Sequence, residues 1–552
     1  MDIKKIETRR QKIISSEEYE NFTTLIDSVR DFFLPQGGRL RTQVAKGAKI
    51  NERRVSDLGI AMLNDYAAGV ISELVTSGQE WFGVEDSKAI QRDKEFFADV
   101  TKIMYNAVNG SNFYEEFYRD QKGAGCDGTS CFYQERSGGE LTDTYVPFGS
   151  FQFVQDFQGR PNIVWVEKKT TVGALVGKYG EDGVSPQCLI DHKKDPDKDI
   201  TIVYYCAPRT ERDPKKTDVK NKRYELIAYE KKTEHLLEEG GTDMQKFLVY
   251  RVKRIGNETL GRGPCIESAC SMAAVERASK EYEKAARMAG VPIFGIGASM
   301  GQNGFRWVNQ ENASMLIYND TGIGHPPQTM NPDNNPEFIM KYIELVTAQA
   351  RQLFYLEYFN PVMDKKNITA TQTREIVSKS QQMVDQLVGP LIKERLNPYL
   401  QWVFVNLGES GAFSEYGGWD EIQAKMAGGR IKFVYKSRLA NAQKRIKLAG
   451  DLEYAEICGM LAQTIPDPVM QYEFLVRTDW EKLPDKIRDG VNASIDLLRD
   501  PKEAKKMAEE FKKGLAQQAQ MENTVKAADA YAKSNQTVAP DSPPSAMVSG
   551  RM

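Results

Sequence analysis

The segment that most constrains the fold of this chain runs from residue 260 to residue 400, and it opens with Gly261-Arg262-Gly263-Pro264. Glycine allows a sharp turn, and proline is favourable in the first turn of a helix because its missing N–H would be unpaired there anyway. This corner therefore predicts a helix over residues 265–290. Gly290 and Pro292 then predict the end of that helix.

A second helix is predicted over residues 336–359. Its apolar positions lie alternately four and three residues apart: Ile339, Ile343, Val346, Ala350 and Leu353. Such spacing makes a seam for packing against a neighbouring helix. Residues 291–332, between the two helices, contain short apolar runs among Gly, Asn and Pro, which predicts small strands and turns. An arm of two helices about 35 Å long cannot bury its own faces, so we expect it to need neighbours, which an oligomer would supply.

The connection after the second helix, residues 360–370, contains Lys365, Lys366 and Asn367. In an arbitrary protein, such a charged loop is most often a solvated link between two helices. On the inner side of a ring, however, its lysines would be repeated once per subunit and would form a cationic collar. Both interpretations stay open at this point.

Outside this segment, helical patterns followed by strand patterns predict an α+β fold. Helical spacing begins after Ser15-Ser16-Glu17-Glu18, continues over residues 52–76 and 93–108, and restarts with Ser111 or Asn112 as the cap. Candidate strands follow at residues 131–135, 144–155, 163–168, 200–207, 224–229 and 247–251, with a short helix at 172–179. Farther on, the patterns predict helices at 371–406, 440–464 and 501–531 and a strand at 430–436. Trp81 and Phe82 follow a helix and are interpreted as core residues.

No motif indicates catalysis or cofactor binding. Gly123-Ala124-Gly125-Cys126-Asp127-Gly128 fits a dinucleotide-binding pattern, but it follows a helix and precedes a strand, whereas such a site needs the reverse order. We therefore interpret it as a glycine-rich turn. The three histidines (His192, His235 and His325) and the seven cysteines are scattered, so we expect surface histidines, buried or free thiols, no metal and no cofactor.

The formal net charge of −3 and the pI near 6.0 argue against a protein that coats nucleic acid with a basic surface. They are compatible with a conduit for DNA, because long-lived phosphate contacts would slow a moving duplex. No apolar run approaches the roughly 20 residues that span a bilayer, and the first residues lack the apolar region of a secretory signal. We therefore expect a reducing cytoplasm as the place of synthesis and no membrane partner.

Several local motifs occur in one order along the chain. They are Trp81-Phe82, Ser111-Asn112-Phe113-Tyr114, Gly261-Arg262-Gly263-Pro264, Thr369-Ala370-Thr371, Leu387-Val388-Gly389-Pro390, Glu394-Arg395-Leu396, Val434-Tyr435-Lys436-Ser437 and Leu439-Ala440-Asn441-Ala442-Gln443. Each motif is weak alone, but their order and spacing over about residues 39–499 are specific. In these features the chain resembles the head-to-tail connectors, or portal proteins, of podovirus-type bacteriophages.

The resemblance implies a twelve-fold ring with a channel at one vertex of the capsid. Double-stranded viral DNA would enter through it during packaging and leave through it at infection. The implied partners are other copies of the chain, the terminase large subunit, tail adaptor proteins, and the major capsid and scaffold proteins. The implied location is the virion, after synthesis in the host cytoplasm. The protein would be structural, with no catalytic residue, and a separate ATPase would supply the energy of packaging.

By position, the resemblance implies an α+β wing, a two-helix stem, a small α/β clip and a helical crown. The implied bounds are wing 1–260, first stem helix 261–290, clip 291–332, second stem helix 333–359, channel loop 360–370, wing helix and strand 371–438, crown 439–533 and a disordered tail 534–552. Lys365, Lys366 and Asn367 would then face DNA.

Two other functions remain as alternatives. The nearer one is another head–tail structural protein of a phage, such as a tail adaptor, which would form a ring below the capsid vertex rather than in it. The other is an enzyme that processes nucleic acid through an unrecognised site. Nuclease or ATPase activity that is lost when a cluster of carboxylates is changed would favour the enzyme.

Overall fold

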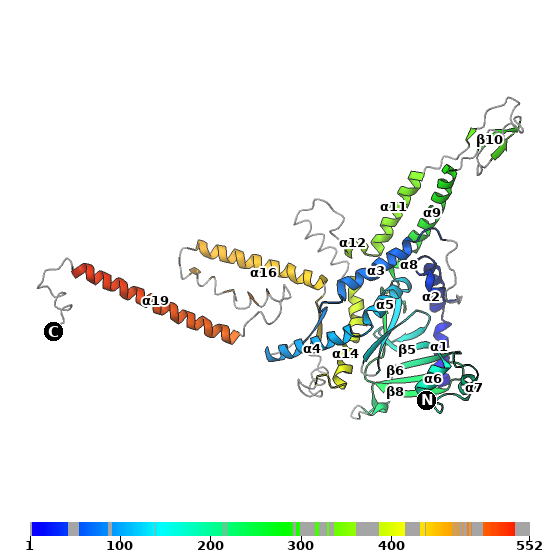
Figure 1. The fold of residues 1–552 in the computed structure, drawn as a ribbon, viewed down its shortest axis with the longest axis horizontal. Coiled ribbons are helices and arrows are strands. Elements are labelled where there is room, and N and C mark those ends of the chain that lie inside the picture. Colours follow the sequence, from blue (N-terminus) through cyan, green and yellow to red (C-terminus); the bar gives the residue numbers. More distant parts are fainter. Residues whose placement is uncertain are drawn as a thin grey trace. The chain divides into compact units, whose positions relative to one another are not determined.

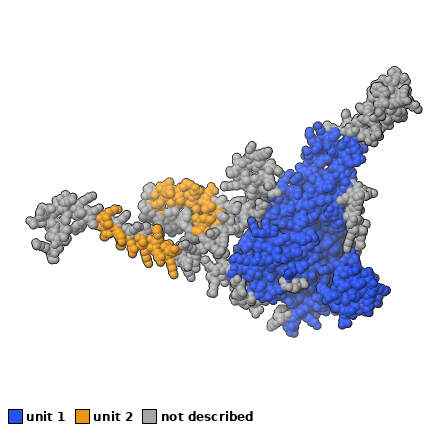
Figure 2. Space-filling view, viewed as in Figure 1, with its two compact units in different colours: residues 1–439 blue, residues 440–552 orange. Residues whose placement is uncertain are grey.

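The computed structural model describes residues 3–41, 54–86, 91–137, 140–213, 218–290, 294–298, 315–318, 328–329, 336–359, 386–413, 431–436, 438–465 and 501–535, with residue 216 and isolated positions between 467 and 487. Figure 1 shows its helices and strands. The chain divides into two compact units, residues 1–439 and residues 440–552 (Figure 2). All of the described strands belong to the first unit.

The first unit begins with helices that build most of one side of its core. They are α1 (Ile3–Ile14), α2 (Glu17–Phe33), α3 (Leu58–Leu74), α4 (Gln91–Asn109) and α5 (Phe113–Asp127), with a 3-10 turn η1 (Pro35–Gly37) after α2. The Ser16 hydroxyl caps α2 by accepting a hydrogen bond from the N–H of Tyr19. The buried faces of α2, α3 and α5 contact one another. Apart from α1, these helices confirm the helical patterns in the sequence.

An antiparallel sheet of five strands follows, in the order β4-β5-β6-β7-β8. Its strands are β4 (Phe151–Gln155), β5 (Pro161–Thr171), β6 (Asp199–Pro208), β7 (Tyr224–Glu230) and β8 (Leu236–Thr242); α6 (Val172–Tyr179), α7 (Pro186–Lys194) and the turn η2 (Val219–Asn221) lie in its connections. One face, with Trp165 and Tyr205, packs against Ile6 of α1. The other face, with Val164 and Tyr204, joins the main core.

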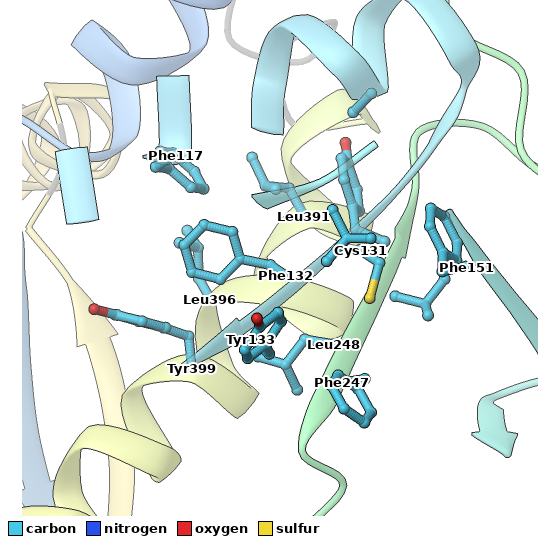
Figure 3. Packing of buried hydrophobic residues seen from close by; sticks show 14 of the residues in the cluster. Phe117, Cys131, Phe132, Tyr133, Phe151, Phe247, Leu248, Leu391, Leu396 and Tyr399 are labelled. Atoms are coloured by element: carbon cyan, nitrogen blue, oxygen red, sulfur yellow. The ribbon is translucent and has the colours of Figure 1, made fainter. Parts of the chain in front are cut away.

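A second antiparallel sheet, β3-β2-β9, lies at the centre of the main core. It contains β2 (Thr129–Ser137), β3 (Glu140–Val146) and β9 (Phe247–Arg251). Figure 3 shows Phe132 of β2 and Leu248 of β9 beside Leu396 and Tyr399, which come from a helix 150 residues farther along the chain. That helical segment contains the π-helix η4 (Ile392–Leu396) and α14 (Asn397–Glu409). The predicted α+β class is therefore confirmed.

Two short strands far apart in the sequence form a separate ribbon. β1 (Phe82–Asp86) pairs with β13 (Ile431–Tyr435) in antiparallel register, with Phe82 opposite Tyr435 and Asp86 opposite Ile431. β13 confirms the predicted strand at residues 430–436. β1 had no clear pattern in the sequence, because Phe82 and Val84 are its only large apolar residues.

The predicted helix–module–helix arm is present. After the corner, α8 (Pro264–Glu267) leads into α9 (Ala269–Gly290), and α11 (Pro336–Leu353) runs beside α9 (Figure 1). Between them, β10 (Phe294–Gly297), β11 (Met315–Tyr318) and β12 (Gln328–Thr329) form a small sheet in the order β11-β10-β12. This confirms the small strands predicted for residues 291–332. α12 (Leu356–Phe359) follows α11.

Four local predictions were wrong. Residues 123–127 are not a turn: they form the last turns of α5, and only Gly128 has the left-handed conformation, with φ of 79°. The single strand expected at 144–155 is two strands, because Phe148 and Gly149 lie in a turn between β3 and β4. The helix over 265–290 is interrupted at Ser268. The helix over 336–359 is interrupted at Tyr355, which has φ of 58°.

The second unit contains α16 (Arg438–Thr464), which begins just before the unit boundary, and α19 (Pro501–Asn535). These helices confirm the patterns at residues 440–464 and 501–531. Residues 536–552, most of the predicted disordered tail, lie outside the described residues.

Candidate functional site

The two glycine motifs of the sequence meet at the base of the helix pair. A Cβ atom on Gly263 would overlap the carbonyl oxygen of Gly125, and Cβ atoms on Gly128 and Gly261 would each overlap the carbonyl oxygen of the other residue. Backbone therefore packs directly on backbone, which requires glycine on both sides. We call residues 123–128 and 261–264 the glycine junction.

Hydrogen bonds fix the glycine junction to the sheet. The N–H of Gly261 donates to the Thr129 hydroxyl at 2.8 Å, and the N–H of Val252 donates to the carbonyl of Gly128 at 3.0 Å. The guanidinium of Arg262 pairs with Glu258 at 2.6 Å. The start of the helix pair is thus held by the end of α5 and the end of β9, so the orientation of α8 is set by the body of the unit.

A buried arginine holds the helix before α14 against the central sheet. Arg395 is fully buried and donates to the Asp120 carboxylate and to the Ser130 hydroxyl, each at 2.8 Å. Its guanidinium also lies 5.3 Å from the centre of the Phe132 ring. An unpaired charge at this depth would cost several kcal/mol, so Arg395 and Asp120 depend on each other.

The neighbouring residue, Glu394, forms an ion pair with a second buried arginine. Arg251 is fully buried at the end of β9, and its guanidinium contacts the Glu394 carboxylate at 2.5 Å. Arg251 also donates to the carbonyl of Gly159, in the turn between β4 and β5, at 2.9 Å. Glu394 and Arg395 lie in η4, where Pro398 lacks the N–H that would bond the Glu394 carbonyl in a regular helix.

The predicted core residues Trp81 and Phe82 are both buried. The ring centre of Trp81 is 6.0 Å from that of Phe113, which in turn stacks on Tyr399 at 4.4 Å. Tyr114 lies beside Phe113, with 5.5 Å between ring centres. The motifs around residues 81 and 112 therefore come together in one aromatic cluster.

Asn112 does not cap α5 with its side chain, so that option for the predicted cap is wrong. Its amide instead exchanges two hydrogen bonds with the backbone of Asp143, at 2.8 and 2.9 Å. Ser111 is closer to the predicted role, because its hydroxyl accepts from the N–H of Phe113 at 3.2 Å. Glu115 pairs with Arg119 rather than with the start of the helix. The α5 N-terminus is therefore bound to β3.

Asp143 is a buried carboxylate for which no ion pair is seen among the described residues. It accepts hydrogen bonds from Gln134 at 3.1 Å, from the Ser111 hydroxyl at 3.2 Å and from the Tyr399 hydroxyl at 3.0 Å. Burial raises the pKa of Asp143 to about 6. The three hydrogen bonds stabilise the charged form and oppose this rise only in part. The nearby Glu116 carboxylate raises this pKa further. No sequence pattern indicated this group.

The helix pair has an inner face and an outer face. Val346 and Ala350 of α11 are buried against α9, which confirms that part of the predicted seam. Ile339 and Ile343 are half-buried, whereas Leu353 is exposed. A second apolar stripe lies on the side of α11 next to this seam: Phe338 is 70% exposed and Leu345 is 60% exposed, with Tyr342 between them. We call Phe338, Tyr342 and Leu345 the outer stripe.

The chain just after the C-terminal end of α11 is anchored in the core. Phe354 is fully buried, with its ring centre 5.5 Å from that of Phe33 and 6.2 Å from that of Tyr66. The left-handed backbone of Tyr355 then redirects the chain into α12. Phe359 packs on Gly69 of α3, where a Cβ atom would overlap its ring. The connection that starts at residue 360 therefore leaves from a fixed point.

Several predicted site residues lie outside the described residues: Lys365, Lys366, Asn367, Thr369, Ala370 and Thr371. Gly389 and Pro390 are helical and half-buried, just before η4. The buried pairs of Arg251 and Arg395 were not predicted, although Arg395 lies in one of the family motifs.

Other kinds of site were also sought. Within the part of the chain that the structure describes, no group of three or more His, Cys, Asp or Glu side chains is placed to hold a metal ion. No described helix is long and apolar enough to cross a membrane. All seven cysteines are free thiols, and only Cys270 is exposed. This confirms the expectation of buried or free thiols.

Comparisons with known proteins point to one family. The family model described as "Bacteriophage head to tail connecting protein" matches residues 4–498. A protein of Bordetella phage BPP-1 named "Probable portal protein" is 22% identical over 501 residues, which cover 87% of this chain and 86% of that protein. The match includes the glycine junction, the aromatic cluster and the helix pair.

Proposed function

The chain belongs to the family of bacteriophage head to tail connecting proteins, and from this membership we propose that it is a portal protein. In this role copies of the chain form a closed ring at one capsid vertex, with a channel for double-stranded viral DNA. The function is structural. The name of the Bordetella phage relative supports the same assignment.

The observation that carries this proposal is the outer stripe of α11. Phe338, Tyr342 and Leu345 lie three and four residues apart on one side of the helix, and all are exposed in the single chain. α9 already covers the neighbouring side of the helix, where Val346 and Ala350 are buried. Exposing such a stripe is unfavourable by about 25 cal/mol per Å² of apolar surface, so it favours contact with a neighbouring helix pair. Repetition of one such contact around an axis closes a ring.

We assign the other parts of the chain by position. α9 and α11 form the stem that lines the channel, and the sheet β11-β10-β12 is the clip at its end. The α+β body is the wing, and α16 and α19 belong to the crown. The ring contains twelve copies. The clip binds the terminase large subunit during packaging and tail adaptor proteins afterwards, and the wing and crown contact the major capsid and scaffold proteins.

The test of the ring is its mass and position. Mass photometry and native mass spectrometry of the purified chain at micromolar concentration are expected to show closed rings, with twelve copies as the main species. Electron microscopy of particles is expected to show this ring in the capsid vertex. Monomers and dimers alone would contradict the ring, and a ring below the vertex would favour a tail adaptor instead.

The loop at residues 360–370 needs a separate test. We propose that Lys365 and Lys366 face DNA phosphates in the channel. The double variant Lys365→Glu, Lys366→Glu should assemble rings of normal mass, but particles that carry it should package or retain less DNA than the wild type. The variant Lys168→Glu, Lys169→Glu, with the same charge change on exposed residues of β5, is the control. Unchanged DNA content and retention would contradict the proposal that Lys365 and Lys366 face DNA.

A further inference from the structure

The first unit contains a surface pocket of about 550 Å³ between α1, α2, the edge strand β4 and residues 257–260. Aromatic and aliphatic side chains form its walls, among them Tyr19, Phe148, Phe151 and Leu260. Its size falls in the range that accommodates the side chains of a binding partner. Neither the glycine junction nor the helix pair uses this pocket.

The rim of the pocket is cationic. Arg9 and Lys12, one turn apart on α1, are exposed, and neither makes an ion pair with a described residue. The acidic residue of the rim, Glu18, accepts hydrogen bonds from the N–H groups of Thr259 at 2.6 Å and Leu260 at 3.3 Å, and its one negative charge leaves the rim with a net positive charge. An apolar segment that carries acidic residues would therefore fit the pocket better than a neutral or basic one.

A rigid turn beside the pocket adds to the apolar surface. Phe157 is fully exposed, at 106% of its reference area, two residues after Gln155 of the pocket wall. The turn is fixed, since Asp156 accepts hydrogen bonds from the N–H groups of Gln158 and Arg160, each at 2.8 Å. An exposed aromatic ring on a fixed turn loses little entropy on binding, which is typical of an interface anchor.

A complementary surface lies at the opposite edge of the same sheet. The strand order β4-β5-β6-β7-β8 puts the pocket at one edge and β8 at the other. On β8, Leu236 is 42% exposed. Glu239, opposite Ile227, is exposed on the face of the sheet that packs on α1, whereas Glu238, opposite Ala228, lies on the other face and accepts a hydrogen bond from the Tyr179 hydroxyl at 3.3 Å. With about 4.8 Å between strands, the two edges are about 19 Å apart, so one chain cannot bring them together.

We propose that the pocket of one copy binds the β8 edge of the next copy in the ring, with Leu236 against the aromatic walls and Glu239 beside Arg9 and Lys12. Two different patches on opposite edges make a heterologous contact, and such a contact closes into a ring when it is repeated around an axis. This contact rests on the proposed function, because it requires a ring of identical chains.

Cross-linking between two distinguishable copies tests the contact. In a Cys270→Ser background, which removes the exposed native thiol, one copy carries Lys12→Cys and a tagged copy carries Glu239→Cys. The two are co-expressed, and assembled rings are treated with a short bismaleimide. We expect a covalent dimer that contains one tagged and one untagged copy, and none when either cysteine is omitted.

The outcomes separate the two proposals. Rings that form without this cross-linked dimer would overturn the contact and leave the portal assignment intact. Dimers between two Lys12→Cys copies would also overturn it, because they would show a symmetric contact. Failure to form any ring, in the wild type as well, would overturn the proposed function and the contact together.

Charge reversal provides an independent measurement. Arg9→Glu with Lys12→Glu should raise the protein concentration at half assembly about tenfold, since three acidic groups then meet at each contact. Adding Glu239→Lys to the same chain should return it to within about threefold of wild type, because the pairing is restored with opposite signs. Lys168→Glu with Lys169→Glu is the matched control. Equal assembly by the reversed and the compensated variants would contradict the contact.

Discussion

The interior of the first unit and its helix pair differ in which side chains they bury: the interior buries charged residues, and the helix pair exposes apolar ones. In the interior, Arg395 and Arg251 are fully buried, and each has a carboxylate partner within the same chain. In the helix pair, Phe338 and Leu345 are largely exposed, and most charged side chains lie on the surface. The buried arginines find their partners within one chain, whereas the helix pair presents apolar surface that no described part of the chain covers.

This difference separates residues that serve folding from residues that serve assembly. A substitution in the interior should lower the free energy of unfolding whatever the oligomeric state. A substitution in the outer stripe should leave the folded monomer intact and change only the association of copies. The following substitutions test which residues serve folding and which serve assembly, from the largest expected effect on stability to the smallest.

Arg395→Met should lower the free energy of unfolding by about 3–5 kcal/mol, because it leaves the Asp120 carboxylate buried without its cation. Urea unfolding followed by circular dichroism measures this loss. Arg119→Met is the matched control, since Arg119 is exposed and pairs with Glu115 on the surface, and its removal should cost at most about 1 kcal/mol. Equal losses for the two variants would show that the buried pair does not support the fold.

Gly128→Ala should cost about 2–4 kcal/mol. The new methyl group would overlap the carbonyl oxygen of Gly261, and the left-handed backbone at φ of 79° adds strain. Gly411→Ala has a similar φ of 77° but open space around the new atom, so it should cost only about 1–2 kcal/mol. Thermal unfolding of both variants separates the cost of the steric overlap from the cost of the left-handed backbone. A loss no larger than that of Gly411→Ala would mean that the glycine junction tolerates a side chain.

Asp143→Asn should change the pH dependence of stability. The folded pKa of about 6 is above the ordinary value of 3.8, so the folded state holds a proton on Asp143 that the unfolded state has lost between these values. The stability that this group contributes is therefore fully present below about pH 4 and is lost as pH rises through 6.

At pH 8 the Asn variant should be more stable than wild type by about 1–3 kcal/mol. Its amide oxygen can accept from Gln134, and its NH₂ group can donate to the hydroxyl oxygens of Ser111 and Tyr399. Chemical unfolding from pH 4 to pH 8 measures the two curves, and the advantage of the variant should disappear at pH 4. Parallel curves for the two proteins would contradict the raised pKa.

Phe338→Ser with Leu345→Ser should change monomer stability by no more than about 0.5 kcal/mol, because both side chains are exposed. Ring formation, however, should be lost at concentrations where the wild type is fully assembled. Mass photometry and thermal unfolding of the same samples separate the two effects. Ile190→Ser, which changes an exposed apolar residue of α7, is the control and should assemble normally. A large loss of monomer stability would show that the outer stripe serves folding and not only assembly.

The sequence predicted elements whose signals are local and missed contacts that link distant residues. The seam of α11 and the strands around residues 200 and 250 follow from periodicity, and Pro264 marks its own helix start. The glycine run at 123–128 was misread because the residues that leave no room for side chains there are far away in the chain: Tyr145 at Gly123, Tyr66 at Gly125 and Gly261 at Gly128. The interruption at Tyr355 was missed because Phe354 is drawn into the core beside Phe33, a contact that no local pattern contains.

The site was predicted less completely than the fold. Trp81, Phe82 and Phe113 were placed in the core or in a family motif, and they do form one cluster. The buried pairs of Arg251 and Arg395 were missed, since charged residues are exposed in most contexts and only their burial shows their role. Lys365 and Lys366 remain predictions, and they rest on the family resemblance and on their position after α12.

The pairing of β1 with β13 also has a consequence for the newly made chain. The ribosome completes residues 82–86 roughly 350 residues before it completes their partners at 431–435. At about 5–20 residues per second, this interval lasts about 17–70 s. During that time β1 is an unpaired edge, and Trp81 lacks the Tyr435 ring that later stacks on it. The speed of translation therefore sets a minimum delay before any copy offers a finished body to its neighbours.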